Sequence, residues 1–325
     1  MTLHYDAYDV IIGLFSGGKD SVAMVLQAIE QGVPLARLEL WHHEIDGREG
    51  STLMDWPCTA AYCRAFASTF GVPLYTSWKR GGFEGELLRE NMPTAPNMFE
   101  TSDDVGMSGG RGSSGTRRRF PQLSSDLSVR WCSAYLKIDV GAAAIRNQPR
   151  FRGKRVLVLS GERAAESPCR AGYAVFESHR TDLRNRRRYQ RHIDHHRPVH
   201  GLSDAEVWEI LRRWRINPHP AYQLGWGRCS CAGCIFGSAN QWASLRAVNP
   251  AQFNRIAAYE QQFGTTIRRA ETLVQAADRG RPFAAITSNA MRAALSDHWD
   301  APIIVPVDQE WVLPAGAMGD RAGPT

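Results

Sequence analysis

The 325-residue chain has no stretch of 18 consecutive apolar residues, so it contains no segment long enough to cross a bilayer as a helix. Its first ten residues, MTLHYDAYDV, lack the basic region followed by an apolar region that is typical of a secretory signal. We therefore expect a cytoplasmic protein without a membrane partner.

Cysteines are few, because the chain has only seven, an odd and unevenly spaced set. Without an export signal, such a set argues against a disulfide framework and favours a metal site or a reactive thiol. Acidic residues are also in the minority: 33 Asp and Glu stand against 39 Lys and Arg, a formal net charge of +6. This basic excess is compatible with phosphate-rich partners.

The apolar pattern predicts an α/β fold. Apolar runs without alternation are typical of buried parallel strands, and helical spacing is found between them. The expected strands are residues 10–15, 35–43, 72–78 and 155–162, and the expected helices are 21–32 and 57–71. The alternation predicts a doubly wound, Rossmann-like parallel sheet, in which ligands bind at the carboxyl ends of the strands.

The sequence predicts that the chain divides into two structural parts. Residues 1–200 are predicted to form the α/β nucleotide-binding domain, and residues 201–325 a smaller, helical C-terminal part. Gly, Ser and Arg dominate residues 100–130 without a visible period, which predicts a mobile lid. Ser203 with Glu206 three residues later is a capping box and predicts the start of a helix.

The motif SGGKDS, residues 16–21, lies at a predicted junction of strand and helix. Backbone N–H groups at a helix N-terminus form an anion site, and glycines let a phosphate approach. Lys19 adds a cation, and Ser16 and Ser21 add hydroxyl donors. The motif is not a Walker loop, because Asp20 stands where that pattern needs a hydroxyl.

SGGKDS resembles the PP-loop of the ATP pyrophosphatases, in the adenine nucleotide alpha-hydrolase-like (HUP-type) superfamily. The resemblance implies cleavage of ATP between its α- and β-phosphates with Mg²⁺, and adenylation of a substrate. It implies catalytic roles for Lys19 and Asp20. It implies nucleotide contacts by Ser16, Gly17, Gly18, Lys19, Asp20 and Ser21. We expect Lys19→Ala to remove most ATP binding and to leave the fold intact.

Two further segments, RWCSAYLKI (130–138) and GERAAESPCR (161–170), are similar to the phosphoadenosine phosphosulfate reductase branch of this superfamily. The resemblance implies that Lys137 contacts the nucleotide and acts in catalysis. It also implies a phosphate site formed by Arg163, Glu166 and Arg170. The alternative for the two arginines is a role in surface ion pairs.

Cys229, Cys231 and Cys234 form a C-x-C-x-x-C pattern, and Cys132 is the best candidate for a fourth ligand. The resemblance implies a [4Fe–4S] cluster, although the chain departs from the family pattern, with Trp131 in place of the first cysteine of a Cys-Cys pair. Zinc and free thiols are the alternatives. Cys58 and Cys63 are predicted to be core or edge residues. Cys169, near the expected phosphate site, is predicted to be a packing residue, with a reactive thiol as the alternative.

These features together predict an ATP-dependent adenylating enzyme with an iron–sulfur cluster, acting in sulfur transfer to DNA or tRNA, with a sulfur-donor protein such as a cysteine desulfurase. One alternative is a sulfonucleotide reductase. It is disfavoured because those enzymes carry a cysteine in a C-terminal tail, and none follows Cys234 here. Another alternative is a non-catalytic nucleotide-sensing subunit.

Two arginine clusters bear on the acceptor. Arg117–Arg119, together with Arg184 and Arg186–Arg188, are predicted to form a cationic rim around the nucleotide site that binds a nucleic-acid backbone. The alternative is a solvated face.

Overall fold

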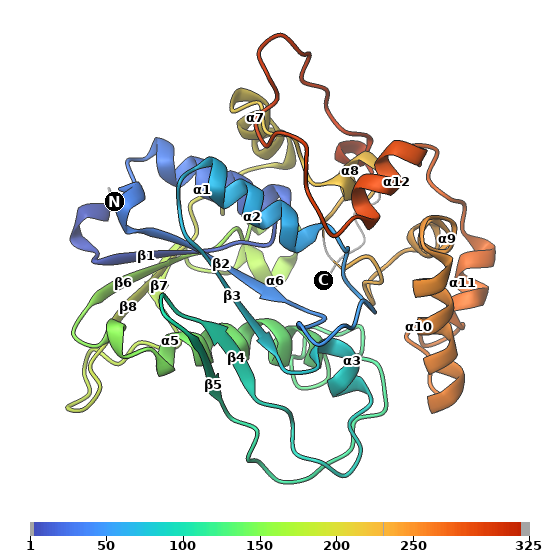
Figure 1. Ribbon diagram of the computed structural model, residues 1–325, viewed down its shortest axis with the longest axis horizontal. Coiled ribbons are helices and arrows are strands. Elements are labelled where there is room, and N and C mark those ends of the chain that lie inside the picture. Colours follow the sequence, from blue (N-terminus) through green and yellow to red (C-terminus); the bar gives the residue numbers. More distant parts are fainter. Residues whose placement is uncertain (1–2, 230, 320–325) are drawn as a thin grey trace.

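An eight-stranded sheet forms the centre of the computed structural model, which describes residues 3–229 and 231–319. The strand order is β5-β4-β3-β2-β1-β6-β8-β7 (Figure 1). The strands are β1 (Val10–Leu14), β2 (Leu38–Glu44), β3 (Leu74–Lys79), β4 (Asn97–Glu100), β5 (Val105–Ser108), β6 (Arg155–Leu159), β7 (Phe176–Ser178) and β8 (His192–His196). The five strands from β3 to β8 in this order pair in parallel, and β4, β5 and β7 add antiparallel edges.

The strand order reverses at β1, because β2 and β3 follow it on one side and β6 and β8 on the other. In an open α/β sheet, this reversal opens a crevice at the carboxyl ends of the two central strands. The expected Rossmann-like parallel sheet is therefore confirmed at the level of an α/β sheet with this switch point. The edge strands β4, β5 and β7 were not predicted.

Helices cover both faces of the sheet (Figure 1). The helices are α1 (Lys19–Glu30), α2 (Thr59–Thr69), α3 (Gly82–Leu87), α4 (Trp131–Ser133), α5 (Asp139–Asn147), α6 (Pro168–Ala171), α7 (Asp204–Arg213), α8 (Pro220–Gln223), α9 (Ala239–Val248), α10 (Pro250–Phe263), α11 (Leu273–Arg279) and α12 (Ser288–Leu295). One core lies between the sheet and α1, α2 and α7, and a second lies between the sheet and α5. A third core joins the C-terminal helices to α3 and Trp131.

Local signals explain several element boundaries. Ser203 caps α7 in the expected capping box with Glu206. A five-residue π-helix, η3 (Ala134–Ile138), separates α4 from α5. Such π-turns are uncommon and are frequently found at functional sites. No helix among the described residues is long and apolar enough to cross a membrane.

Candidate functional site

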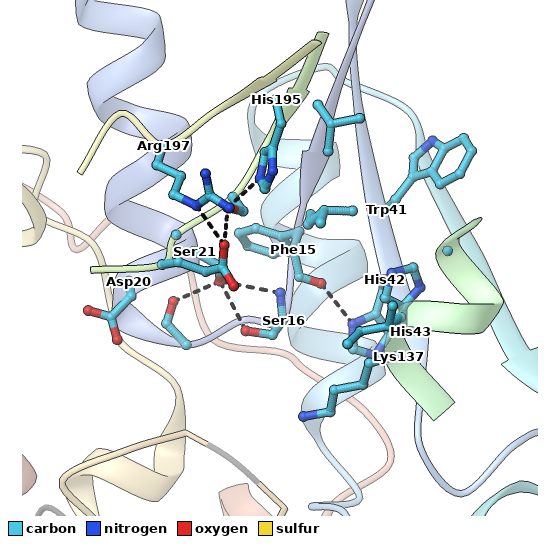
Figure 2. Close-up of a pocket in the computed structure, with 18 of the residues that line it drawn as sticks. Phe15, Ser16, Asp20, Ser21, Trp41, His42, His43, Lys137, His195 and Arg197 are labelled. Carbon is cyan, nitrogen blue, oxygen red and sulfur yellow. Dashed lines mark hydrogen bonds and ion pairs between the residues drawn. The ribbon is translucent and has the colours of Figure 1, made fainter. Parts of the chain in front are cut away.

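A cavity of about 900 Å³ opens at the carboxyl ends of β1, β2 and β6, where the strand order predicts a ligand site. Figure 2 shows its wall, with Ser16 near the centre, His195 and Arg197 on one side and Lys137 on the other. Of the residues predicted from the sequence, the cavity is lined by Ser16, Gly18, Asp20, Ser21, Lys137, Glu166, Arg170, Cys229 and Cys231. The fold thus brings together residues of four motifs that are distant in the sequence.

The loop between β1 and α1 is held rigidly. Gly17 has a φ of +75°, and a Cβ at this position would lie 3.1 Å from the Tyr62 ring. The Ser21 hydroxyl donates to the carbonyl oxygen of Gly18 at 2.8 Å and accepts from the backbone N–H of Ser16 at 3.3 Å. Glycine is therefore required at position 17. The Ser16 hydroxyl also donates to that of Ser21, so the loop holds its shape through its own hydrogen bonds while Ser16, Gly18 and Ser21 line the cavity.

Lys19 and Arg163 do not line the cavity, contrary to the expectation that both contact phosphate. The Lys19 ammonium lies 2.8 Å from Asp20 and 3.2 Å from Asp204, and the Arg163 guanidinium lies 2.5 Å from Asp20 and 2.9 Å from Asp204. The two cations alternate with two carboxylates, and their side chains are only 5% and 2% exposed. In this structure they hold the loop to α7 instead of facing the cavity.

Asp204 was missed by the sequence reasoning, although it is the first residue after the Ser203 cap of α7. Acidic residues are common in the first turn of a helix, because their negative charge is stabilised by the positive end of the helix dipole. Nothing in the sequence therefore distinguished Asp204 from an ordinary residue of a first turn. Tyr222 was also missed. Its hydroxyl accepts from the backbone N–H groups of Lys19 and Cys229, at 2.8 and 3.2 Å, and so ties the loop to the cysteine segment.

Lys137 is located on the π-helix η3 and lines the cavity, as predicted. No hydrogen bond or ion pair of its ammonium group is found within residues 3–229 and 231–319. By contrast, Arg170 in the same wall forms an ion pair with Glu166. Lys137 is thus a cavity cation without a direct ion pair. Its charge acts on Asp55 in the same lining, where it opposes the rise of that carboxyl's pKa to about 7 that burial causes.

The imidazoles of the cavity wall are kept neutral. Burial lowers the pKa of His195 to about 3, with Arg197 adding to the effect, and lowers the pKa of His43 to about 3, with Lys137 contributing. The Nε2 atom of His195 lies 2.8 Å from the Ser160 hydroxyl. At neutral pH these rings can exchange hydrogen bonds with a ligand without adding charge to the site.

His219 lies outside the cavity lining and is fully buried, and its titration gives a test of the fold. Burial lowers the pKa of His219 to about 3, whereas an unfolded histidine titrates near 6.5. Between these values the unfolded chain binds a proton that the folded chain does not, so stability falls as the pH is lowered. The variant His219→Asn keeps an acceptor for the N–H of Ala221, which His219 now caps.

We expect His219→Asn to make the loss of unfolding free energy between pH 6 and pH 4 shallower by about 1.4 kcal/mol per pH unit. Urea unfolding at a series of pH values measures this slope. His298→Asn is the control, because the His298 side chain is 78% exposed. An unchanged slope in His219→Asn would contradict the burial effect.

The four predicted cluster ligands occupy one region, but they do not form a closed set of ligands. Within the described part of the chain, no three His, Cys, Asp or Glu side chains are arranged to hold one metal ion. Burial raises the pKa of Cys132 to about 11, with Cys234 adding to the rise and the nearby Lys137 opposing it. Burial also raises the pKa of Cys231, with Lys137 and Cys234 again as neighbours. The [4Fe–4S] or zinc site therefore stays a prediction.

A buried N–H group lies close to the main chain of the cysteine segment, and we compared it with the two candidate cofactors. The Trp242 indole N–H is buried and finds no hydrogen-bond partner among the described residues. A Cβ placed on Gly237 would lie 3.1 Å from this nitrogen and 3.0 Å from the carbonyl oxygen of Cys234. Thiolates suit iron–sulfur and zinc alike, and these distances relate the indole N–H to the main chain of Cys234, so the donor set fits either group.

The remaining cysteines divide into two kinds. Cys58 and Cys63 are buried, as predicted, with their sulfur atoms 3.3 Å from His219 and 3.6 Å from His42. Cys169 is exposed on α6, so its predicted packing role is wrong. The sequence did not reveal this, because the four-residue helix that carries Cys169 is too short to show an apolar period.

The predicted cationic rim is not formed. The segment of Arg186–Arg188 precedes β8, and Gln190 next to it accepts a hydrogen bond from Gly153, just before β6. The run therefore lies at the amino ends of these parallel strands, opposite to the cavity. Of the other cluster, Arg117 and Arg118 are engaged in ion pairs with Glu86 and Glu90.

Comparison with known proteins does not assign the chain to a family. No known protein family matches the chain. The chain is 28% identical over 151 residues to a protein of Escherichia phage 186 named "Uncharacterized 37.8 kDa protein in gpa 5'region". The match covers 46% of this chain and 42% of the phage protein, so the chain spans less than half of that relative's length.

Proposed function

We propose that the protein is an ATP pyrophosphatase that adenylates its substrate. The observation that carries the proposal is the lining of one cavity, which combines residues of the SGGKDS loop with Lys137, the Glu166–Arg170 pair and two cysteines of the C-x-C-x-x-C pattern. Backbone donors and hydroxyls of the loop suit a chain of phosphates, and a lysine without a direct ion pair suits the charge that develops when they are cleaved.

The residues divide the work as follows. Ser16, Gly18 and Ser21 hold phosphate oxygens, and Lys137 faces the phosphates from the opposite wall. Asp20, which lines the cavity, is the residue that we assign as an oxygen ligand of Mg²⁺. Since Asp20 is already paired with Lys19 and Arg163, the phosphates would supply most of the remaining ligands.

The cysteine segment extends the proposal to sulfur transfer. Cys229 and Cys231 face the cavity, and we assign them, with Cys132 and Cys234, to an iron–sulfur cluster. Such a cluster supplies electrons or sulfur when bound. By resemblance, the acceptor is a nucleic acid, DNA or tRNA, and the sulfur comes from a donor protein such as a cysteine desulfurase.

The test is product analysis of anaerobically purified protein with ATP and, separately, with phosphoadenosine phosphosulfate. We expect AMP and pyrophosphate from ATP. Sulfite from the sulfonucleotide would instead establish a reductase, and binding of ATP without turnover would indicate a nucleotide-sensing subunit.

Metal analysis of the same sample tests the cofactor. We expect about four irons per chain from a [4Fe–4S] cluster, and we expect Cys231→Ser to lose them. One zinc per chain would overturn the assignment.

A further inference from the structure

Arg117 is predicted from the sequence to bind a partner, but its side chain is only 11% exposed and contacts the interior. Its guanidinium carbon lies 5.2 Å from the centre of the Trp131 ring and 5.0 Å from the centre of the Tyr135 ring. Its nitrogen atoms lie 3.1 and 2.8 Å from one carboxylate oxygen of Glu86. One guanidinium therefore joins two aromatic rings to a buried acid.

The two rings belong to the turn that carries the site. Trp131 is the first residue of α4, and Tyr135 lies within the π-helix η3. Cys132 follows the first ring directly, and Lys137 comes two residues after the second ring. Any rotation or unwinding of this turn would move both the lysine in the cavity and a predicted cluster ligand.

Glu86, the carboxylate that pairs with Arg117, is itself held in place by other residues. The Glu86 side chain is 1% exposed and also accepts hydrogen bonds from Arg89 and Thr94. The backbone N–H of Arg117 donates to the carbonyl oxygen of Arg89 at 2.8 Å, which fixes the backbone at Arg117 to the chain just after α3. The cation is thus held over the rings from both its backbone and its side chain.

We propose that Arg117 is a positioning residue that holds the π-helix η3 in the register that directs Lys137 into the cavity. A π-turn is less stable than an α-turn of the same length, so it persists where its surroundings fix it. A largely buried guanidinium held over Tyr135 of that turn and over Trp131 in α4 just before it supplies such a restraint. The proposal rests on the proposed function only for what Lys137 binds, and not for how Lys137 is held.

The chain allows a direct readout, because it contains only four lysines: Lys19, Lys79, Lys137 and Lys154. Lys19 and Lys79 are buried, whereas Lys137 and Lys154 are both exposed, the Lys154 side chain by 51%. Acetylation of the folded full-length protein by a water-soluble succinimidyl ester, followed by peptide mass spectrometry, gives the rate at Lys137 relative to the rate at Lys154. This ratio reports the environment of the π-helix without reference to any activity.

Because Lys137 is already exposed in the cavity, a loosened turn changes how its amine is presented and does not uncover it. We expect Arg117→Gln to change the acetylation ratio of Lys137 to Lys154 by roughly 5–30-fold, the range set by losing two cation–ring contacts. Arg117→Lys keeps a cation near the rings and should give an intermediate value. Arg118→Gln is the matched control: Arg118 is the next residue, pairs with Glu90 and stacks on Phe263, which lies outside the turn. It should leave the ratio unchanged.

A ratio within twofold of the original in Arg117→Gln would overturn the proposal. If that variant does not fold, an unchanged ratio in Arg117→Lys overturns it instead. ATP added to the unmodified chain separates the two proposals. Protection of Lys137 by ATP supports the nucleotide site, whereas a ratio that responds to Arg117 but not to ATP supports the positioning role and contradicts the nucleotide site.

Discussion

Replacing Arg163 with methionine is expected to lower the free energy of unfolding by about 3–5 kcal/mol, because it removes one cation from a buried group of charges. Arg163 is the partner of both Asp20 and Asp204, and its side chain is 2% exposed. Without it, two carboxylates share the single ammonium of Lys19. Methionine fills a similar volume, so the loss reports the uncompensated charge and not a cavity.

Urea unfolding at neutral pH measures this loss, and Arg213→Met is the matched control. Arg213 contacts both carboxylate oxygens of Glu30 at 2.8 Å, but its side chain is 47% exposed. An exposed ion pair contributes at most about 1 kcal/mol. Equal losses in the two variants would show that the Arg163 group is no more sensitive than a surface pair.

The same group of charges changes the expectation for Lys19→Ala. From the sequence alone, this variant should lose ATP binding and keep its fold. In the structure, Lys19 is paired with Asp20 and Asp204, so its removal leaves those carboxylates with Arg163 alone. Lys19→Ala is therefore expected to lower stability as well, and its effect on nucleotide binding cannot be read without a stability measurement.

The sequence was most informative about the elements nearest to the loop. The apolar runs that predict β1 and β6 are buried on both sides of the sheet, which removes polar alternation and makes them easy to recognise. β2 and β3 carry polar residues as well, and their apolar residues at the strand starts were enough to predict them. β8 was missed because its residues, HIDHH, are mostly polar. They are tolerated in a paired strand because the polar atoms find partners, such as Tyr8 and Arg184 for Asp194.

Motifs placed the cavity wall but not the direction of each side chain. A signature such as SGGKDS fixes which residues stand at the strand end, and the cavity does include Ser16, Gly18, Asp20 and Ser21. It does not say where the Lys19 ammonium goes, because that depends on Asp204, about 180 residues away in sequence. Long-range charge pairing of this kind has no local sequence signal.

Replacing Lys137 with alanine is expected to reduce pyrophosphate release from ATP by about 10²–10³-fold, the usual effect of removing one preorganised group that stabilises developing charge. Among the described residues that line the cavity, Lys137 has no direct ion pair, and the Asp55 carboxyl that its charge reaches has a pKa raised to about 7 by burial, so the ammonium is available to a ligand. For the same reason the fold should not depend on it, and the urea midpoint should be unchanged. Lys154→Ala, at an exposed lysine, is the control for the loss of one positive charge. Steady-state turnover and calorimetric binding of ATP measure the two effects, and full turnover in Lys137→Ala would remove this residue from the catalytic wall and leave the loop as the only phosphate site.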